Sequence, residues 1–178
     1  TLTKAFSQAL AVSSEARQAY RVEGDLFHEG FYEGQEVESS SSQWDPLDLN
    51  ASKGKKMSWP EILAFNWSCI LFTTEQMLQR GLDIVIDYVV EDELPLVKEL
   101  AEKYHIPLYY IVLTASEDVL RKRIQERGDI EMINRSLFLK HKLEEEPKNQ
   151  RHLLDNSDMT IENEIDIIMT EVERFLVR

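Results

Sequence analysis

The sequence DIVIDYVV at positions 83–90 is a run of apolar and β-branched residues without a consistently polar face. A strand of this kind is buried on both sides, which is typical of a parallel sheet covered by helices. Segments of helical character surround it at 58–81 and 95–104, and a second apolar run follows at 108–113. This alternation predicts an α/β fold, a doubly wound parallel sheet with helices on both faces in a three-layer arrangement.

Polar residues and glycines mark where several predicted helices begin and end. Ser58 and Glu61 have the spacing of a capping box, and Gly81 occupies the position of a C-terminal cap. Ser116 is the predicted N-cap of a helix over 117–127 that ends at Gly128. The remaining predicted elements are helices at 1–10, 130–145 and 161–177, and short strands at 19–22 and 152–154.

Length and composition narrow the class of protein. A chain of 178 residues is long enough to bury one core, and we expect a single domain over 1–178. The net charge of −13 disfavours nucleic acids and anionic membranes as partners. The single cysteine, Cys69, argues against a disulfide framework, and no apolar run approaches the roughly 20 residues of a membrane helix. We therefore expect a cytoplasmic protein, while no pattern indicates its oligomeric state.

The positive charges are concentrated in one segment. Between Leu120 and Lys142 seven basic side chains accompany three acidic ones, a net +4, whereas the rest of the chain carries −17. Arg123 and Arg127 are one helical turn apart, so their guanidinium groups could clamp one polyanion. The alternative interpretation is a solvated helix face with ordinary charge pairs.

Three acidic residues lie at or near the ends of predicted strands. Glu23 and Asp25 follow the first strand, with His28 one turn further on, and Asp87 lies late in the apolar strand. Carboxylates in such places can activate a hydroxyl or hold a magnesium-bound water. Asp25 could instead cap the following turn. Asp87 must be paired, linked to a metal or emerging at the edge of the sheet, because an isolated charge is costly to bury.

The order of these segments resembles that of a known family. The stretches TLTKAF, EGDLFH, DIVIDYVV, LYYIVLTASEDVLRKRIQER and HLLDNSDMT together resemble the P-loop small-molecule kinases, particularly the gluconate-kinase-like and chloramphenicol-phosphotransferase-like branches. In that family the first helix continues from a G-x-x-x-x-G-K-[ST] loop that cradles nucleotide phosphates. Thr1 looks like the last hydroxyl residue of that loop or the one after it, so we expect a strand and loop of about a dozen residues upstream. The stretch 34–56 matches nothing in the family, and we interpret it as a flexible insertion.

The resemblance implies a phosphotransferase that uses ATP and Mg²⁺ to phosphorylate a hydroxyl of a small molecule, such as a sugar acid or an antibiotic. Its lid would span about 120–145. The implied catalytic residues are Asp25, as acceptor-site base, with Arg121 and Arg127. The implied substrate-binding residues are Glu23, His28 and Asp87. The implied ATP-binding residues are Thr1, Arg123 and Arg135, and the implied metal ligands are Thr1 and Asp87.

Two alternatives stay open at this point. A nucleotide or nucleoside kinase needs a base pocket, which Trp44, Trp59 or Trp67 could supply. A nucleotide-binding domain without activity would keep the fold alone. In either kinase, we expect the acceptor pocket to involve the residues from Asp25 to His28, the helix around 65–69 and the insertion.

Overall fold

The computed structural model describes residues 2–13, 18–28 and 57–178, which form two compact units. One unit is Ser7–Leu100, and the other combines Thr1–Phe6 with Ala101–Arg178. Helix α1 (Leu2–Ser13) contributes to both. A single domain over 1–178 stays a prediction. Thr1 and the expected insertion at 34–56 lie outside the described residues.

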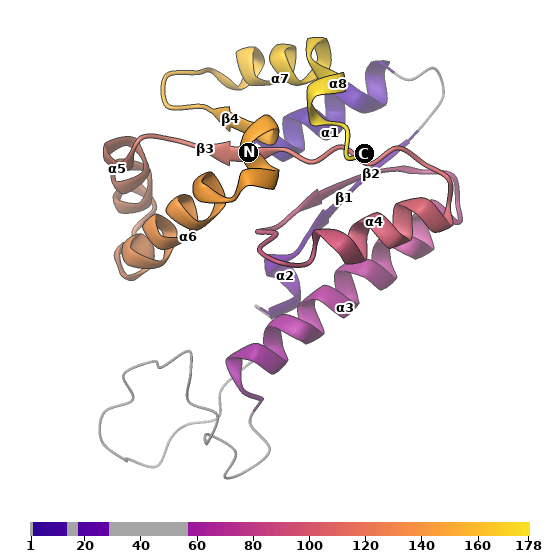
Figure 1. Cartoon of the computed structure of the whole chain (residues 1–178), viewed down its shortest axis with the longest axis horizontal. Helices are drawn as coiled ribbons and strands as arrows, with labels where there is room; N and C mark the ends of the chain where they lie inside the picture. The colour runs from indigo at the N-terminus through magenta and orange to yellow at the C-terminus, as the bar shows by residue number, and fades with distance from the viewer. Residues whose placement is uncertain (1, 14–17, 29–56) are drawn as a thin grey trace. The chain divides into compact units, whose positions relative to one another are not determined.

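The unit Ser7–Leu100 is built on a pair of parallel strands. Strand β1 (Ala19–Glu23) pairs with β2 (Asp83–Asp87) in a register that sets Ala19 opposite Asp83 and Glu23 opposite Asp87. Helix α3 (Trp59–Leu78) packs against both strands, and the short helix α2 (Asp25–His28) packs against α3 (Figure 1). Helix α4 (Leu94–Lys103) follows β2. The buried core includes Val22, Trp67, Ile70 and Val97.

The caps predicted at both ends of α3 are confirmed. The Ser58 backbone N–H and Oγ both donate to Glu61 Oε2 at 2.7 Å. The helix ends at Leu78, three residues before Gly81. Gly81 has φ +74°, a left-handed conformation that glycine adopts without strain. Its N–H donates to the Leu78 carbonyl at 2.9 Å and the Leu82 N–H donates to the Met77 carbonyl at 3.3 Å, so Gly81 is the C-terminal cap that the sequence predicts. From Ile62 to Thr74 the helix contains no charged residue, so its apolar character extends round the whole helix.

The second unit contains its own parallel pair, β3 (Val112–Thr114) with β4 (Leu153–Asp155). Its main helices are α5 (Glu117–Arg127), α6 (Ile133–Glu145), α7 (Ile161–Thr170) and α8 (Val172–Phe175). Two 3₁₀ turns, η1 (Ile130–Met132) and η2 (Pro147–His152), flank α6. Its core is formed by Leu154, Ile168 and Phe175, with Phe6 packed against them.

The caps predicted for α5 are confirmed. Ser116 Oγ accepts the backbone N–H of Val119 at 3.4 Å, and Gly128 lies in the left-handed region with φ +88°. The helix therefore has the boundaries that the sequence predicts, because both ends satisfy backbone groups locally.

The prediction of one doubly wound sheet is not confirmed. The described residues form a mixed α/β structure, mostly helical, with two separate two-stranded parallel sheets. The strand predicted at 108–113 is reduced to Val112–Thr114, because the carbonyl of Leu108 and the N–H of Tyr110 pair with the C-terminal residues Val177 and Phe175. The final helix breaks at Glu171, between α7 and α8, instead of running to residue 177. None of the described helices has both the length and the apolar character needed to cross a membrane.

Candidate functional site

Acidic side chains gather at the carboxyl ends of β1 and β2. Glu23 and Asp87 are register partners at the last position of each strand. The N–H of Gly24 donates to the carbonyl of Asp87 at 3.0 Å, and Asp25 then begins α2. The structure thus brings together three residues that the sequence predicts as site residues, at the edge of a parallel sheet where ligands bind in α/β proteins.

One arginine is shared by two of these acids. Arg21 lies on β1 two residues before Glu23 and forms an ion pair with it. Its Nη1 also lies 3.9 Å from Asp87 Oδ2. The Asp87 side chain is 42% exposed, so this carboxylate is paired and emerges at the edge of the sheet. Both of these were among the outcomes expected for an acid in an apolar strand.

Tyr88 is a residue of this region that the sequence reasoning missed. It lies next to Asp87, where β2 ends, and its hydroxyl accepts a hydrogen bond from Nδ2 of the buried Asn66 at 3.1 Å. Its ring contacts Trp67 edge to face, with centroids 5.4 Å apart and an interplanar angle of 74°. The available signal was Asn66, a polar residue inside the uncharged stretch of α3.

The electrostatics of Tyr88 link it to the acids around it. Burial raises the pKa of the Tyr88 phenol, and the negative charges of Asp25, Glu93 and Glu91 raise it further, whereas the hydrogen bond from Asn66 opposes them. Tyr88 is therefore a neutral hydroxyl at physiological pH. Asp25 is exposed and acts on this hydroxyl through its charge. His28 is the last residue of α2, and its side chain lies outside the described part of the structure.

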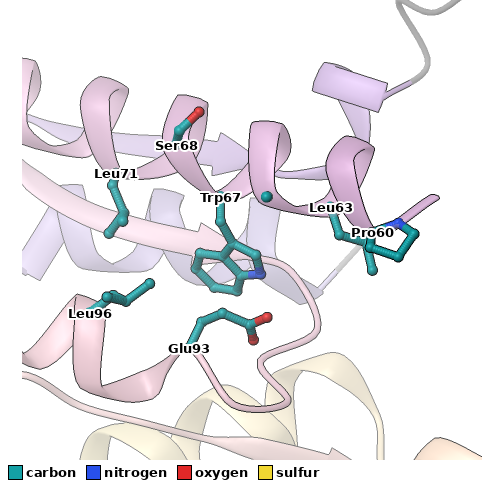
Figure 2. Close-up of a pocket in the computed structure, with 8 residues that line it drawn as sticks. Pro60, Leu63, Trp67, Ser68, Leu71, Glu93 and Leu96 are labelled. Carbon is teal, nitrogen blue, oxygen red and sulfur yellow. The ribbon is translucent and has the colours of Figure 1, made fainter. Parts of the chain in front are cut away.

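A cavity of about 490 Å³ opens beside this region on α3. Trp67 and Ser68, from the helix segment 65–69, are among the residues that line it. That this cavity is the predicted acceptor pocket stays a prediction. Figure 2 shows the Trp67 indole between α3 and the start of α4, with Leu71 and Leu96 on one side and Glu93 facing it. Since Trp67 also contacts Tyr88, one aromatic residue joins the cavity to the acidic edge of the sheet.

The arginines predicted for the lid lie in the other unit, on α5 and α6, which pack against each other. Arg121 lies 3.7 Å from Glu117, and Arg127 Nε lies 3.5 Å from Asp129. Arg123 donates to Asn156 Oδ1 at 2.8 Å and to the Asn156 carbonyl at 2.9 Å. The Arg135 guanidinium lies 5.5 Å from the Phe138 ring centroid. Each side chain thus has a partner in its own unit, and its role toward ATP stays a prediction.

The carboxylates at the ends of β1 and β2 are oxygen ligands of the type that Mg²⁺ prefers. Among residues 2–13, 18–28 and 57–178, no group of three or more His, Cys, Asp or Glu side chains is placed to hold a metal ion by itself. Mg²⁺ is commonly bound through one or two carboxylates together with waters and substrate phosphates. Glu23 and Asp87 are carboxylates of the kind that such a site uses, and their role toward Mg²⁺ stays a prediction.

Comparison with known proteins shows a likeness in fold. No known family model matches the sequence, and no curated protein matches it either. The solved structure of a Deinococcus radiodurans tunicamycin resistance protein superposes with a TM-score of 0.55 at 9% sequence identity, covering 90% of this chain and 85% of that chain. A Chloroflexus aurantiacus J-10-fl protein described as a "putative kinase" gives a TM-score of 0.48 at 16% identity, covering 97% of this chain and 90% of that one. At these identities the first likeness establishes a shared fold.

Proposed function

We propose that the protein is an ATP-dependent phosphotransferase that phosphorylates a hydroxyl of a small molecule. The observation that carries this proposal is the set of carboxylates at the ends of two parallel strands, Glu23 and Asp87 side by side and Asp25 at the start of α2. The order of the sequence segments, which resembles the P-loop small-molecule kinases, supports the same activity.

Asp25 is the proposed acceptor-site base. Its carboxylate is exposed, so it can reach a bound hydroxyl, orient that group and take its proton as the new oxygen–phosphorus bond forms. Positioning by such a group matters because phosphoryl transfer requires mainly alignment and charge neutralisation from the protein. The neutral Tyr88 hydroxyl, held by Asn66, keeps a polar uncharged group among the acids.

The other charged residues have supporting roles in this proposal. Arg21 holds Glu23 and Asp87 together and limits their mutual repulsion. Asp87, with Glu23 beside it, would hold Mg²⁺ through oxygen ligands. When bound, ATP and Mg²⁺ supply the transferable phosphoryl group and neutralise its charge. We assign the arginines Arg121, Arg123, Arg127 and Arg135 to the same neutralising role on the basis of the family resemblance.

The test is a turnover screen with the natural full-length protein. It would be incubated with ATP, Mg²⁺ and panels of sugar acids, nucleosides and hydroxylated antibiotics, and ADP release and new phosphomonoesters would be followed by ³¹P NMR. The antibiotics include tunicamycin, since a protein of this fold is a tunicamycin resistance protein. We expect one class of acceptor to be phosphorylated in proportion to ADP release. Turnover of nucleosides alone would favour a nucleoside kinase, and ATP binding without turnover would favour a non-catalytic domain. Failure to bind ATP at millimolar concentration in calorimetry would refute the proposal.

A further inference from the structure

The cavity on α3 has walls that are almost entirely apolar. Six of its eight lining residues have apolar side chains, contributed by α3 and the first turn of α4: Pro60, Leu63, Ala64, Trp67, Leu71 and Leu96. The two polar lining residues are Ser68 and Glu93. A cavity of about 490 Å³ with such walls is in the size range of small-molecule sites, which are mostly apolar with a few polar groups that set orientation.

The two polar lining residues differ in what they offer to a ligand. Ser68 Oγ donates to the carbonyl of Phe65 at 2.7 Å, so its hydrogen atom is used within its own helix. Glu93 Oε2 accepts the backbone N–H groups of Glu91 and Asp92 at 3.1 and 3.0 Å, which fixes the carboxylate at the edge of the cavity. A carboxylate has acceptor positions for more than two donors, so Glu93 can receive a further one from a ligand.

The charge of the segment that forms the cavity is predominantly negative. Glu91, Asp92 and Glu93 are consecutive, and from Met57 to Leu100 the chain carries eight acidic side chains against two basic ones. An anion entering the cavity would meet repulsion from this region, whereas a cation would be attracted. A sugar acid is both anionic and strongly hydrated, and it suits neither the walls nor the charge.

A chain of packed residues links the wall of the cavity to the turn that precedes the proposed base. Trp67 lines it and contacts Tyr88, and Tyr88 in turn lies against Gly24, the residue before Asp25. Asp25 and Glu93 both act on the Tyr88 hydroxyl through their charges. A molecule seated against Trp67 is therefore separated from the acidic edge of the sheet by a single aromatic residue.

We propose that this cavity binds an apolar molecule carrying one protonated amine, with its body against Trp67, Leu71 and Leu96 and its amine beside Glu93. The inference rests on the proposed function in one respect, since it identifies this molecule as the acceptor and requires it to bear a hydroxyl. Binding itself needs no ATP, so the two proposals can fail separately.

The test uses three probes with one shared body and different charge: 4-phenylbutylamine, 4-phenylbutan-1-ol and 4-phenylbutyrate. Each is titrated into the full chain without ATP by calorimetry. We expect the amine to bind at least about tenfold more tightly than the alcohol, a preference that weakens as salt is added, and the acid to bind weakest. Equal binding of the amine and the alcohol, tighter binding of the acid, or no saturable binding of the amine would overturn the proposal.

Variants separate the contributions of charge and shape. Glu93→Gln retains an oxygen acceptor for the backbone N–H groups and removes the charge, so we expect it to abolish the preference for the amine while the alcohol binds as before. Ala64→Met fills the cavity from an exposed position of α3 and should weaken all three probes. Glu99→Gln, at an exposed position of α4 outside the cavity, is the matched control and should change nothing. Loss of amine preference in Glu99→Gln but not in Glu93→Gln would contradict the assignment.

Two further measurements complete the test. Sedimentation at increasing protein concentration addresses a second copy as occupant, and a dimer that Ala64→Met dissociates would overturn the small-molecule proposal. Turnover with 4-amino-1-phenylbutan-1-ol, which adds a hydroxyl to the amine probe, tests the link to function. If the amine binds but its hydroxylated form is not phosphorylated, the cavity assignment stands and the result counts against the kinase. If anionic acceptors are phosphorylated but the amine does not bind, the kinase stands and the cavity assignment is wrong.

Discussion

Gly24 lies so close to Tyr88 that a β-carbon on Gly24 would come within 2.3 Å of Tyr88 Cδ2 and 2.5 Å of Cγ. It would also approach Ile70 Cδ1 to 2.9 Å. This contact sets the ring of Tyr88 against the turn between Glu23 and Asp25. Gly24 is therefore required for close approach of two segments, since its φ lies outside the left-handed region that favours glycine.

Gly24→Ala should accordingly destabilise the protein. The added methyl forces Tyr88 or the backbone to move, and overpacking of this kind typically costs about 1–3 kcal/mol. The free energy of unfolding from urea denaturation measures the effect. We also expect the turnover rate of the variant to fall by a larger fraction than its free energy of unfolding, because Asp25 moves with the displaced turn.

The control for this prediction is Gly81→Ala, where no atom lies within 4 Å of the added β-carbon. This variant loses free energy of unfolding only because alanine is strained at a φ of +74°. That cost is about 1–2 kcal/mol and should leave turnover intact. Replacing Tyr88 by Leu in the Gly24→Ala background should recover part of the lost stability. If the double variant is destabilised by the sum of the two single changes, the steric account of Gly24 is wrong.

His152 should make the stability of the second unit depend on pH. It is buried, and its Nδ1 lies 2.9 Å from the Tyr110 carbonyl. Burial lowers the pKa of His152, and the charges of Arg151 and Arg174 lower it further, against the opposing hydrogen bond to Tyr110. Because the folded pKa lies below the unfolded value of about 6.5, the stabilising contribution is present above that pH and is lost as the pH falls toward the folded pKa.

The measurement compares wild type with His152→Gln. As the pH is lowered from about 7.5 to about 5, the free energy of unfolding should fall more steeply for wild type than for His152→Gln. Because only one proton is involved, the two slopes should differ by at most about 1.4 kcal/mol per pH unit. His141→Gln, at an exposed position 3.2 Å from Glu117, is the control and should not flatten the curve in this way. Parallel curves for wild type and His152→Gln would show that this histidine is not held neutral.

Arg123 should stabilise the second unit in the absence of nucleotide. Its two hydrogen bonds to Asn156 join α5 to the segment after β4, at exposed positions where such bonds contribute about 1 kcal/mol. Arg123→Gln should lose about that amount. Lys122→Gln removes a neighbouring charge whose side chain is 75% exposed and should cost less than about 0.5 kcal/mol. Unchanged stability in Arg123→Gln together with lost ATP affinity would mean that the guanidinium leaves Asn156 to bind phosphate.

The elements that sequence predicts well are those specified by neighbouring residues. Ser58 with Glu61, and Ser116 with Gly128, mark helix ends through backbone groups satisfied within a few positions. The strand predicted at 83–90 from its own apolar run is present, although it ends at Asp87. The gathering of Glu23, Asp25 and Asp87 followed from a general property of parallel sheets, whose carboxyl ends lie together.

The features that sequence reasoning missed depend on distant partners. Leu108 and Tyr110 read as strand, yet their backbone groups pair with the C-terminal segment, a choice that no local pattern encodes. In the sequence Tyr88 is one more residue of an apolar run. Its hydrogen bond comes from Asn66, which lies 22 residues earlier on α3. The cavity likewise combines α3 with Glu93 and Leu96, which approach only in the folded chain.

The most direct test of the central claim is the turnover of Asp25→Asn in the natural full-length protein, measured with ATP and the acceptor that the screen identifies. If Asp25 is the base, turnover should fall by about 10²–10⁴-fold while the affinity for ATP is nearly unchanged. Asp83→Asn, at the opposite end of β2 from Asp87, is the matched control and should retain turnover. A variant Asp25→Asn that turns over at the wild-type rate, or that loses ATP binding and turnover equally, would contradict the account.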